Sequence, residues 1–314
     1  MSDDDDKSIT RRNFLKASVM FSGTLALSGC TGIFSLRTYN NSCSYDNYSS
    51  TEDIRKINFA YLNAADLRGN TDNIWAIISR DKALFRAKYL AKIMHDNDID
   101  VLCLSEVDYK GTAKTGGLNQ PETIAKALGH PYNYAVFDQY FKSAAWTTGN
   151  AVISRHPMKA LHRHIFGTRY GIFGRLRHVF KDFIHVSIKV GKRRLDTIVN
   201  HFDDSFIDIR MEEVKDLMDY VSRLYYSDPE RYIVSPGDYN SRHSSKPIRK
   251  ILSYNILHAP PKNFGMYTYQ AHKPVKDIDH IFATENLSIT NYRTFHYPYS
   301  DHLGLMCTLE FKDA

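Results

Sequence analysis

Short runs of apolar, β-branched and aromatic residues, separated by glycine, asparagine and aspartate, predict β-strands along most of the chain. The predicted strands lie at 57–62, 101–105, 132–137, 151–154, 183–190, 195–200, 232–234, 280–283 and 305–311. Apolar positions at helical spacing predict helices at 82–96, 122–128 and 209–225. In the last of these, the buried face would consist of Val214, Leu217, Met218 and Val221.

The predicted strands and helices interleave from residue 54 onward without an obvious linker or internal repeat. This favours a single α/β domain over residues 54–314. Several strands follow one another with only turns between them, which predicts mixed sheets. The chain has 43% hydrophobic and 13% aromatic residues, enough to build a sizeable core, and this composition excludes a disordered chain.

The N-terminal segment carries the pattern of an export signal. Thr10-Arg11-Arg12-Asn13-Phe14-Leu15-Lys16 is a twin-arginine pattern, and the mildly apolar run 17–27 is shorter than the ~20 residues of a membrane span. Leu27-Ser28-Gly29-Cys30 resembles a bacterial lipobox, in which Cys30 becomes the lipidated first residue. A conventional cleaved signal with a coincidental cysteine is the alternative.

This pattern predicts three segments: a twin-arginine-type signal peptide at 1–29, a polar tether at 30–53 and the domain at 54–314. We therefore expect a protein exported to a bacterial cell envelope. It would be bound to a membrane through its lipid anchor, with the domain outside the cytoplasm. We expect no obligate protein partner.

The remaining cysteines do not form a metal-binding pattern, because no paired Cys/His spacing is present. Cys43 lies in the expected tether. Cys103 and Cys307 lie in apolar strand-like runs, where a free thiol behaves as a small buried apolar group. A disulfide between these two residues is the less favoured alternative.

The chain has a formal charge of +6, and the expected signal contains as many acidic as basic residues, so the mature protein keeps this excess. Such an excess suits an anionic substrate, although a solvated surface explains it equally well.

Polar side chains stand next to the ends of most predicted strands, which is the usual geometry of an α/β active site. They are Asn63, Glu106, Asn150, His201, Asp238, Asn240, Asp279, Asp301 and His302. The turn Gly237-Asp238-Tyr239-Asn240 places a carboxylate and an amide side by side at a strand end. Such a pair could hold an attacking water against a phosphorus atom.

The order of these motifs resembles that of the endonuclease/exonuclease/phosphatase superfamily. This superfamily includes deoxyribonucleases of the DNase I type, apurinic endonucleases, sphingomyelinases and inositol-phosphate 5-phosphatases. The motifs are Asn63, Ser105-Glu106, Gly149-Asn150, Asn200-His201, Gly237-Asp238-Tyr239-Asn240, Ile278-Asp279-His280-Ile281 and Ser300-Asp301-His302. The resemblance implies a four-layer α/β/β/α sandwich, with two mixed β-sheets packed face to face and helices outside. It also implies a Mg²⁺-dependent phosphoester hydrolase.

A phosphodiester repels nucleophiles, so its hydrolysis requires a cation, a base and hydrogen-bond donors. The resemblance implies that Glu106 is the Mg²⁺ ligand, assisted by Asn63 and by Asp301 as a second carboxylate. Mn²⁺ and Ca²⁺ are alternative ions. Asp66 is a further candidate carboxylate on the metal side. Asp238 would be the base that activates the water.

The donors come from the remaining motifs. Asn240 would fix the water or a phosphate oxygen, and Asn150 would bind the substrate phosphate. His201 and His302 would donate to the phosphate, most effectively as imidazolium, with Asp279 orienting His302. Taken singly, Asn63 and Asn150 are equally typical of an ordinary turn and a strand-start cap.

The substrate depends on the loops. Residues 155–181 are rich in arginine, lysine, phenylalanine and tyrosine, a mixture that could bind a nucleic-acid backbone and its bases. The same segment could bind anionic lipid headgroups, or form a solvated loop that covers an edge of the core. We therefore expect a phosphodiesterase or nuclease that acts on nucleic acid by in-line attack of an activated water. The alternatives are a sphingomyelinase-like phospholipid hydrolase, an inositol- or sugar-phosphate phosphatase, and an inactive binding module of the same fold.

Overall fold

The computed structural model describes residues 36–39, 45–69, 77–129, 133–138, 148–166, 181–260 and 266–312. The chain divides into two units, Met1–Ile33 and Phe34–Ala314, and every described residue belongs to the second. The expected signal peptide, Cys30 and Cys43 therefore lie outside the described residues. Among the residues that are described, no helix is both long enough and apolar enough to cross a membrane.

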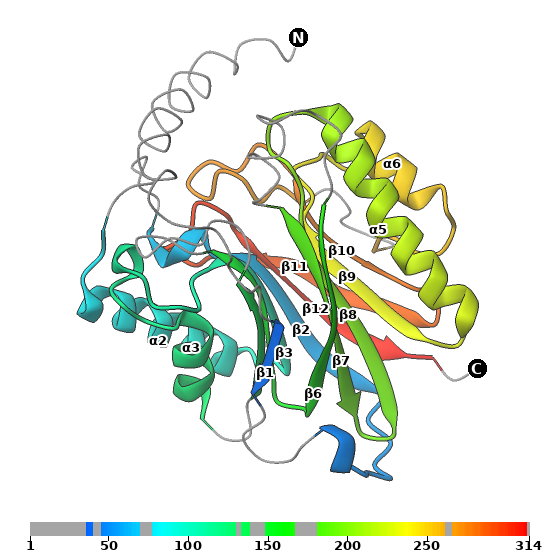
Figure 1. The fold of residues 1–314 in the computed structure, drawn as a ribbon, viewed down its shortest axis with the longest axis horizontal. Helices are drawn as coiled ribbons and strands as arrows, with labels where there is room; N and C mark the ends of the chain where they lie inside the picture. The colour runs from blue at the N-terminus through cyan, green and yellow to red at the C-terminus, as the bar shows by residue number, and fades with distance from the viewer. Residues whose placement is uncertain are drawn as a thin grey trace, which may run out of the picture. The chain divides into compact units, whose positions relative to one another are not determined.

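One sheet has seven strands and is mixed (Figure 1). Its order is β1 (Leu36–Tyr39), β4 (Asn133–Asp138), β5 (Gly149–Ser154), β3 (Val101–Val107), β2 (Lys56–Asn63), β12 (Gly304–Phe311) and β11 (Leu287–Phe295). Its central strands β2 and β3 are parallel, and every other neighbouring pair is antiparallel.

The second sheet has five strands and repeats this arrangement. Its order is β10 (Asp279–Ala283), β9 (Tyr232–Asp238), β8 (Arg193–His201), β7 (Asp182–Val190) and β6 (Met158–Ile165). Here β8 and β9 are the parallel pair, and the others run antiparallel. Each sheet is thus mixed, as the sequence predicts.

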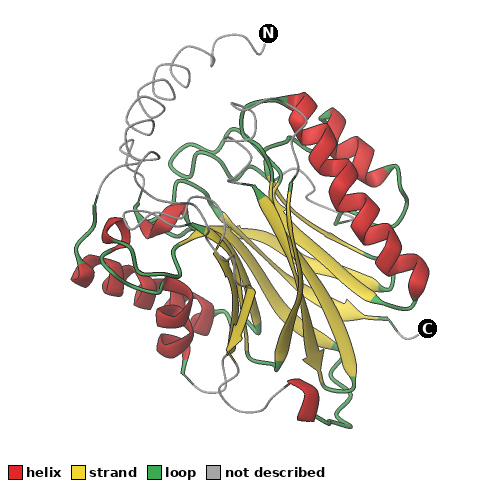
Figure 2. Ribbon diagram, in the orientation of Figure 1, coloured by secondary structure: helices red, strands yellow, loops and turns green. Residues whose placement is uncertain are grey.

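The two sheets pack face to face around one apolar core. Phe59, Val101 and Val152 come from the seven-stranded sheet, and Ile184 and Val234 from the five-stranded sheet, all fully buried. Most central strand positions are buried on both faces, because helices cover the outer face of each sheet (Figure 2). This explains why these strands are almost continuously apolar in sequence.

Helices α2 (Arg80–Asp96) and α3 (Gln120–Leu128) cover the seven-stranded sheet, while α5 (Ile207–Ser227) and α6 (Lys246–Leu252) cover the five-stranded sheet. The ends of α2 and α3 follow local sequence signals. Ser79 caps α2 by accepting from the Lys82 backbone N–H, and Asn119 caps α3 by accepting from that of Glu122. The predicted four-layer α/β/β/α sandwich is confirmed.

Part of the expected tether belongs to the folded domain. Residues 36–39 form β1, which pairs with β4 at the edge of the seven-stranded sheet. The short helix η1 (Tyr45–Asn47) follows, and the Tyr45 hydroxyl lies 2.8 Å from the Ser187 hydroxyl on β7. Sequence composition alone did not reveal these contacts, because a polar segment can pair its backbone with an edge strand without an apolar pattern.

The sequence missed β6, β11 and α6. Both strands lie at sheet edges and alternate weakly, with many half-exposed polar positions. Cys103 and Cys307 are free, buried thiols, as the favoured interpretation predicted. Burial raises the pKa of both thiols, so neither is a reactive thiolate at neutral pH.

Candidate active site

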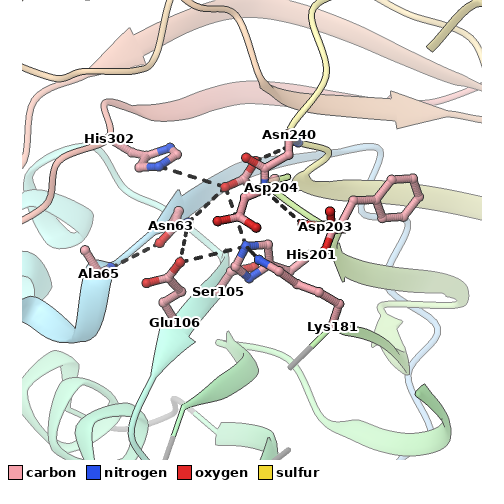
Figure 3. Close-up of polar contacts among 12 residues, drawn as sticks. Asn63, Ala65, Ser105, Glu106, Lys181, His201, Asp203, Asp204, Asn240 and His302 are labelled. Atoms are coloured by element: carbon pink, nitrogen blue, oxygen red, sulfur yellow. Dashed lines mark hydrogen bonds and ion pairs between the residues drawn. The ribbon is translucent and has the colours of Figure 1, made fainter. Parts of the chain in front are cut away.

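The strand ends that carry the predicted site residues meet at one edge of the sandwich. In the seven-stranded sheet, Asn63 at the end of β2 is in register with Ser105 on β3, next to Glu106. In the five-stranded sheet, Asp238 is in register with His201 on one side and with Asp279 on the other. The site therefore forms between the two sheets, with side chains from both (Figure 3).

Asp238 lies at the centre of this group and is 2% exposed. It accepts hydrogen bonds from Asn63 Nδ2 at 3.0 Å and from the Asn240 backbone N–H at 2.9 Å. Its Oδ2 lies 3.7 Å from His201 Nε2 and 3.9 Å from His302 Nε2. Burial raises the pKa of Asp238 to about 7; the charge of Asp279 adds to this shift, and the positive charge of His302 opposes it.

His302 is held as an imidazolium. Its Nδ1 lies 2.8 Å from Asp279 Oδ2, and both residues are buried. Burial by itself lowers the pKa of His302, but the charge and hydrogen bond of Asp279, with the charge of Asp238, raise it to about 10. This agrees with the predicted pairing of Asp279 with His302.

Glu106 is more accessible than Asp238 and Asp279. It lies at a bulge where β3 loses register with β5, and its backbone φ is +52°. Its side chain is 30% exposed, and Asn63 Nδ2 donates to its Oε1 at 3.3 Å. A bulge at a strand end changes the direction of a side chain, and here the carboxylate points toward Asn63 and His201, whose Nε2 lies 3.8 Å from Glu106 Oε1.

The donor set fits a hard divalent cation at Glu106. Hard cations take oxygen ligands and need few protein carboxylates, and the half-exposed side chain of Glu106 can supply one. Asn63 faces Glu106 with its Nδ2, while its Oδ1 accepts from the Ala65 backbone N–H at 3.1 Å, so in this arrangement Asn63 orients Glu106. Ligand atoms of Asp238, Asp279 and His302 also lie within 4.8 Å of one another, a spacing that a metal could occupy. However, His302 and Asp279 are buried and already paired with each other at 2.8 Å, whereas Glu106 is half-exposed, so we favour Glu106 as the metal ligand.

The chain matches the model of the Endonuclease/Exonuclease/phosphatase family over residues 70–302. That range covers most of the domain and all but Asn63 of the motifs. The chain belongs to this family.

Solved structures show the same fold. An endonuclease/exonuclease/phosphatase from Beutenbergia cavernae aligns with a TM-score of 0.64 and 17% identity, over 83% of this chain and 73% of that one. The human Nocturnin catalytic domain with bound sulfate aligns at 0.58 and 16% identity, covering 82% and 94%. A mannosyl-6-phosphatase from Bacteroides thetaiotaomicron aligns at 0.58 and 15%, covering 81% and 100%. No curated protein matches the chain.

The structure gives His201 a different state from the expected imidazolium. Its Nε2 lies 2.5 Å from the ammonium of Lys181 and 3.8 Å from Glu106 Oε1. Burial, with the positive charges of Lys181 and His302, lowers the pKa of His201 well below its usual range. In this member of the family His201 is therefore a neutral imidazole.

Asn150 supports the floor of the site. It is 1% exposed, accepts from the Ser105 hydroxyl at 2.7 Å, and donates from Nδ2 to Asp182 Oδ1 at 2.5 Å. The Tyr61 hydroxyl donates in turn to Ser105 at 3.0 Å. These contacts occupy the amide that was expected to bind the phosphate, so Asn150 acts as a positioning residue between the two sheets.

Asn240 fixes the turn after β9. Its backbone φ is +46°, a left-handed conformation that asparagine tolerates, and its Nδ2 donates to the Phe202 backbone carbonyl at 2.8 Å. Position 237, just before this turn, requires glycine, because a Cβ there would overlap Asn200. Asp301 is half-exposed beside His302, and its charge contributes to the raised pKa of His302.

Asp66, the further carboxylate considered for the metal side, has its pKa raised by burial, and it lies close enough to Glu106 for the charge of Glu106 to add to this shift. It is 1% exposed and forms ion pairs with Lys114 Nζ at 2.8 Å and Arg68 Nε at 3.5 Å. Two cations therefore contact its Oδ2, whereas its buried Oδ1 has no hydrogen-bond partner among the described residues.

Sequence reasoning missed Ser300 and Lys181. The Ser300 hydroxyl donates to the Asn63 backbone carbonyl at 2.6 Å and accepts from the His302 backbone N–H at 3.0 Å, which ties the two motifs together. Ser300 belongs to the motif Ser300-Asp301-His302, so its position could have been noticed in the sequence. The basic segment 155–181 contains several arginine and lysine residues, and the sequence does not indicate which of them reaches the site.

Proposed function

We propose that this chain is a Mg²⁺-dependent phosphodiesterase that hydrolyses nucleic acid by in-line attack of an activated water. One observation carries the proposal: Asp238 is a buried carboxylate with a pKa near 7, and it lies between Asn63, His201 and a charged His302. A general base works best when its pKa is near the working pH. The family membership supports the phosphoesterase class.

The side chains divide the reaction among them. Asp238 accepts the proton of the water as the water attacks phosphorus, and the backbone contact from Asn240 holds this carboxylate in place. The P–O bond opposite the water breaks, and the leaving oxygen takes a proton from solvent. His302 donates to the negative charge that develops on a phosphate oxygen, with Asp279 keeping its proton available. Glu106 would hold the cation, with Asp301 as a second carboxylate ligand and with the assistance of Asn63. When bound, the cation polarises a phosphoryl oxygen.

Nucleic acid is the leading substrate because of the charge and the basic, aromatic segment 155–181. Residues 167–180 of that segment lie outside the described residues, and Arg163 and Lys181 flank them. A sugar phosphate is the second candidate, on the likeness of the fold to the mannosyl-6-phosphatase.

A panel of substrates tests the proposal. Purified protein with Mg²⁺ is given plasmid DNA, RNA, sphingomyelin, an inositol polyphosphate and mannose 6-phosphate, with His302→Ala as the matched control for contaminating enzymes. We expect cleavage of nucleic acid by the wild type and at least about a 100-fold slower reaction in His302→Ala. Intact nucleic acid with cleavage of a lipid, inositol or sugar phosphate contradicts the substrate, and no cleavage of any of them favours a binding module.

We further propose that the protein is exported and lipid-anchored through Cys30, on the strength of its twin-arginine and lipobox patterns. Expression in a bacterium with radiolabelled palmitate tests this. We expect label and membrane association in the wild type and in Cys43→Ala, and loss of both in Cys30→Ala. Label that persists in Cys30→Ala, or an unlabelled wild type, contradicts the anchor.

A further inference from the structure

Lys181 brings a positive charge to the site that none of the recognised motifs contains. It lies immediately before β7, and its side chain reaches toward His201 (Figure 3). The ammonium lies 2.5 Å from His201 Nε2, and its charge lowers the pKa of the catalytic base Asp238. Among the described residues, the hydrogen-bond partner of this ammonium is His201, and an ammonium carries three N–H donors.

The hydrogen bond fixes the state of His201. An ammonium has donors and no acceptor, so the Nε2 atom that it faces must accept. His201 is then a neutral imidazole with its proton on Nδ1. The positive charge on this side of Asp238 therefore belongs to Lys181, and His201 holds it there.

The backbone at Lys181 is fixed by the hydrogen bonds of the residue that follows it. The next residue, Asp182, is fully buried and accepts from Asn150 Nδ2 at 2.5 Å. Asn150 in turn accepts from Ser105, the neighbour of Glu106. One buried chain of hydrogen bonds thus sets both the carboxylate of Glu106 and the ammonium of Lys181, so their relative placement is built into the fold.

We propose that Lys181 is the second positively charged side chain of the phosphate site, in addition to His302. Its ammonium donates to a non-bridging oxygen of the substrate phosphate, from the side opposite His302, and His201 positions it as a neutral acceptor. This inference rests on the proposed phosphoesterase function. It also assigns His201 a positioning role in place of direct donation to the phosphate.

Three variants test the role of Lys181 in hydrolysis of bis-p-nitrophenyl phosphate with Mg²⁺. We expect Lys181→Ala to lower kcat/KM about 100-fold, as the loss of one donor to a developing oxyanion does, and Lys181→Arg to recover at least about tenfold of this. The control is Lys192→Ala, whose ammonium pairs with Asp53 at 3.2 Å in the β7–β8 turn, and it keeps the wild-type rate. A Lys181→Ala enzyme within about twofold of the wild type overturns the proposal.

Two readouts do not need activity. Nitrogen-15 spectra of the His201 ring are expected to show Nε2 unprotonated in the wild type and the preference lost in Lys181→Ala. Binding of inorganic phosphate is expected to weaken about tenfold in Lys181→Ala. A proton on Nε2 in the wild type, or unchanged phosphate binding, overturns the role of Lys181. A wild type that binds phosphate but hydrolyses no phosphoester contradicts the proposed function alone.

Discussion

Asp238 and His302 have opposite protonation preferences within one buried group. Burial and the charge of Asp279 raise the pKa of Asp238 to about 7, whereas Asp279 and Asp238 raise that of His302 to about 10 against the effect of burial. Above pH 7 the base is ionised, and below pH 10 the donor is charged. The ionised base and the charged donor therefore coexist between pH 7 and pH 10, and the plot of kcat/KM against pH should be bell-shaped, with its maximum in this range.

Replacing Asp279 should narrow that window. In Asp279→Asn, His302 loses its charged partner, so its pKa should fall from about 10 toward the ordinary value of about 6.5. The alkaline limb of kcat/KM then moves to lower pH, and activity at pH 8 falls about 10- to 100-fold. An NMR titration of the His302 ring measures the shift directly.

Asp277→Asn is the matched control, because Asp277 lies two residues earlier and hydrogen-bonds His243 instead. It should leave the His302 titration unchanged. If the titration of His302 in Asp279→Asn matches that of the wild type, Asp279 does not hold the proton.

At the scale of elements, the five-stranded sheet contains a buried cluster of charged residues that has no role in the proposed reaction. Asp196 on β8 is fully buried and forms ion pairs with Arg231 at 2.8 Å and Arg194 at 3.5 Å. Its Oδ1 lies 3.2 Å from His185 Nε2 on β7. The cluster joins β7, β8 and the residue before β9, and so fixes the strand that carries His201.

Removing Asp196 should destabilise the protein. Asp196→Asn removes the counter-charge from the mostly buried Arg231 and leaves the buried His185 without its carboxylate, which costs about 3–5 kcal/mol of unfolding free energy. Burial opposes the charge of Asp196, but His185 and the other cations hold its pKa below the usual range. Its stabilisation is therefore present above its unfolded pKa of about 3.9 and is lost as the pH falls through the lower folded value.

Urea unfolding at pH 7 and at acid pH measures this effect. The control is Asp98→Asn, whose carboxylate is 74% exposed and pairs with Arg155; it should cost no more than about 1 kcal/mol. An Asp196→Asn variant as stable as the control at pH 7 contradicts the structural role of the cluster.

The sequence predicted the elements better than the contacts between them. Apolar runs that end in a polar residue marked Asn63, His201 and Asp238, because a buried strand must become polar where it leaves the core. The 3.0 Å contact between Asn63 and Asp238 joins two sheets, and no local pattern reports it. The left-handed backbone at Glu106 and the reach of Lys181 depend in the same way on tertiary packing.

At the scale of the whole molecule, the two sheets each contribute one half of the site. The seven-stranded sheet supplies Asn63 and Glu106, and the five-stranded sheet supplies Asp238 and His201. A ligand that needs these groups in their folded positions binds only the folded state, so it should raise the stability of the entire domain.

Mg²⁺ should therefore raise the melting temperature. At a concentration of 100 Kd, one bound ion adds about 2.7 kcal/mol to the unfolding free energy. The gain should disappear in Glu106→Gln and persist in Glu310→Gln, because Glu310 pairs with Lys56 at the far end of β2. Differential scanning fluorimetry with EDTA, Mg²⁺, Mn²⁺ and Ca²⁺ measures it. An equal gain in Glu106→Gln places the ion elsewhere.

The role of Asp238 as the buried base is the central claim, and its pH–rate profile tests it most directly. We measure kcat/KM for bis-p-nitrophenyl phosphate with Mg²⁺ from pH 5 to 10 in the wild type and in Asp238→Asn, with circular dichroism to confirm that both are folded. The wild type should show an acid limb near pH 7, and the variant should lose at least about 1,000-fold in kcat/KM. A folded Asp238→Asn protein that keeps the wild-type rate and the same acid limb would contradict this role.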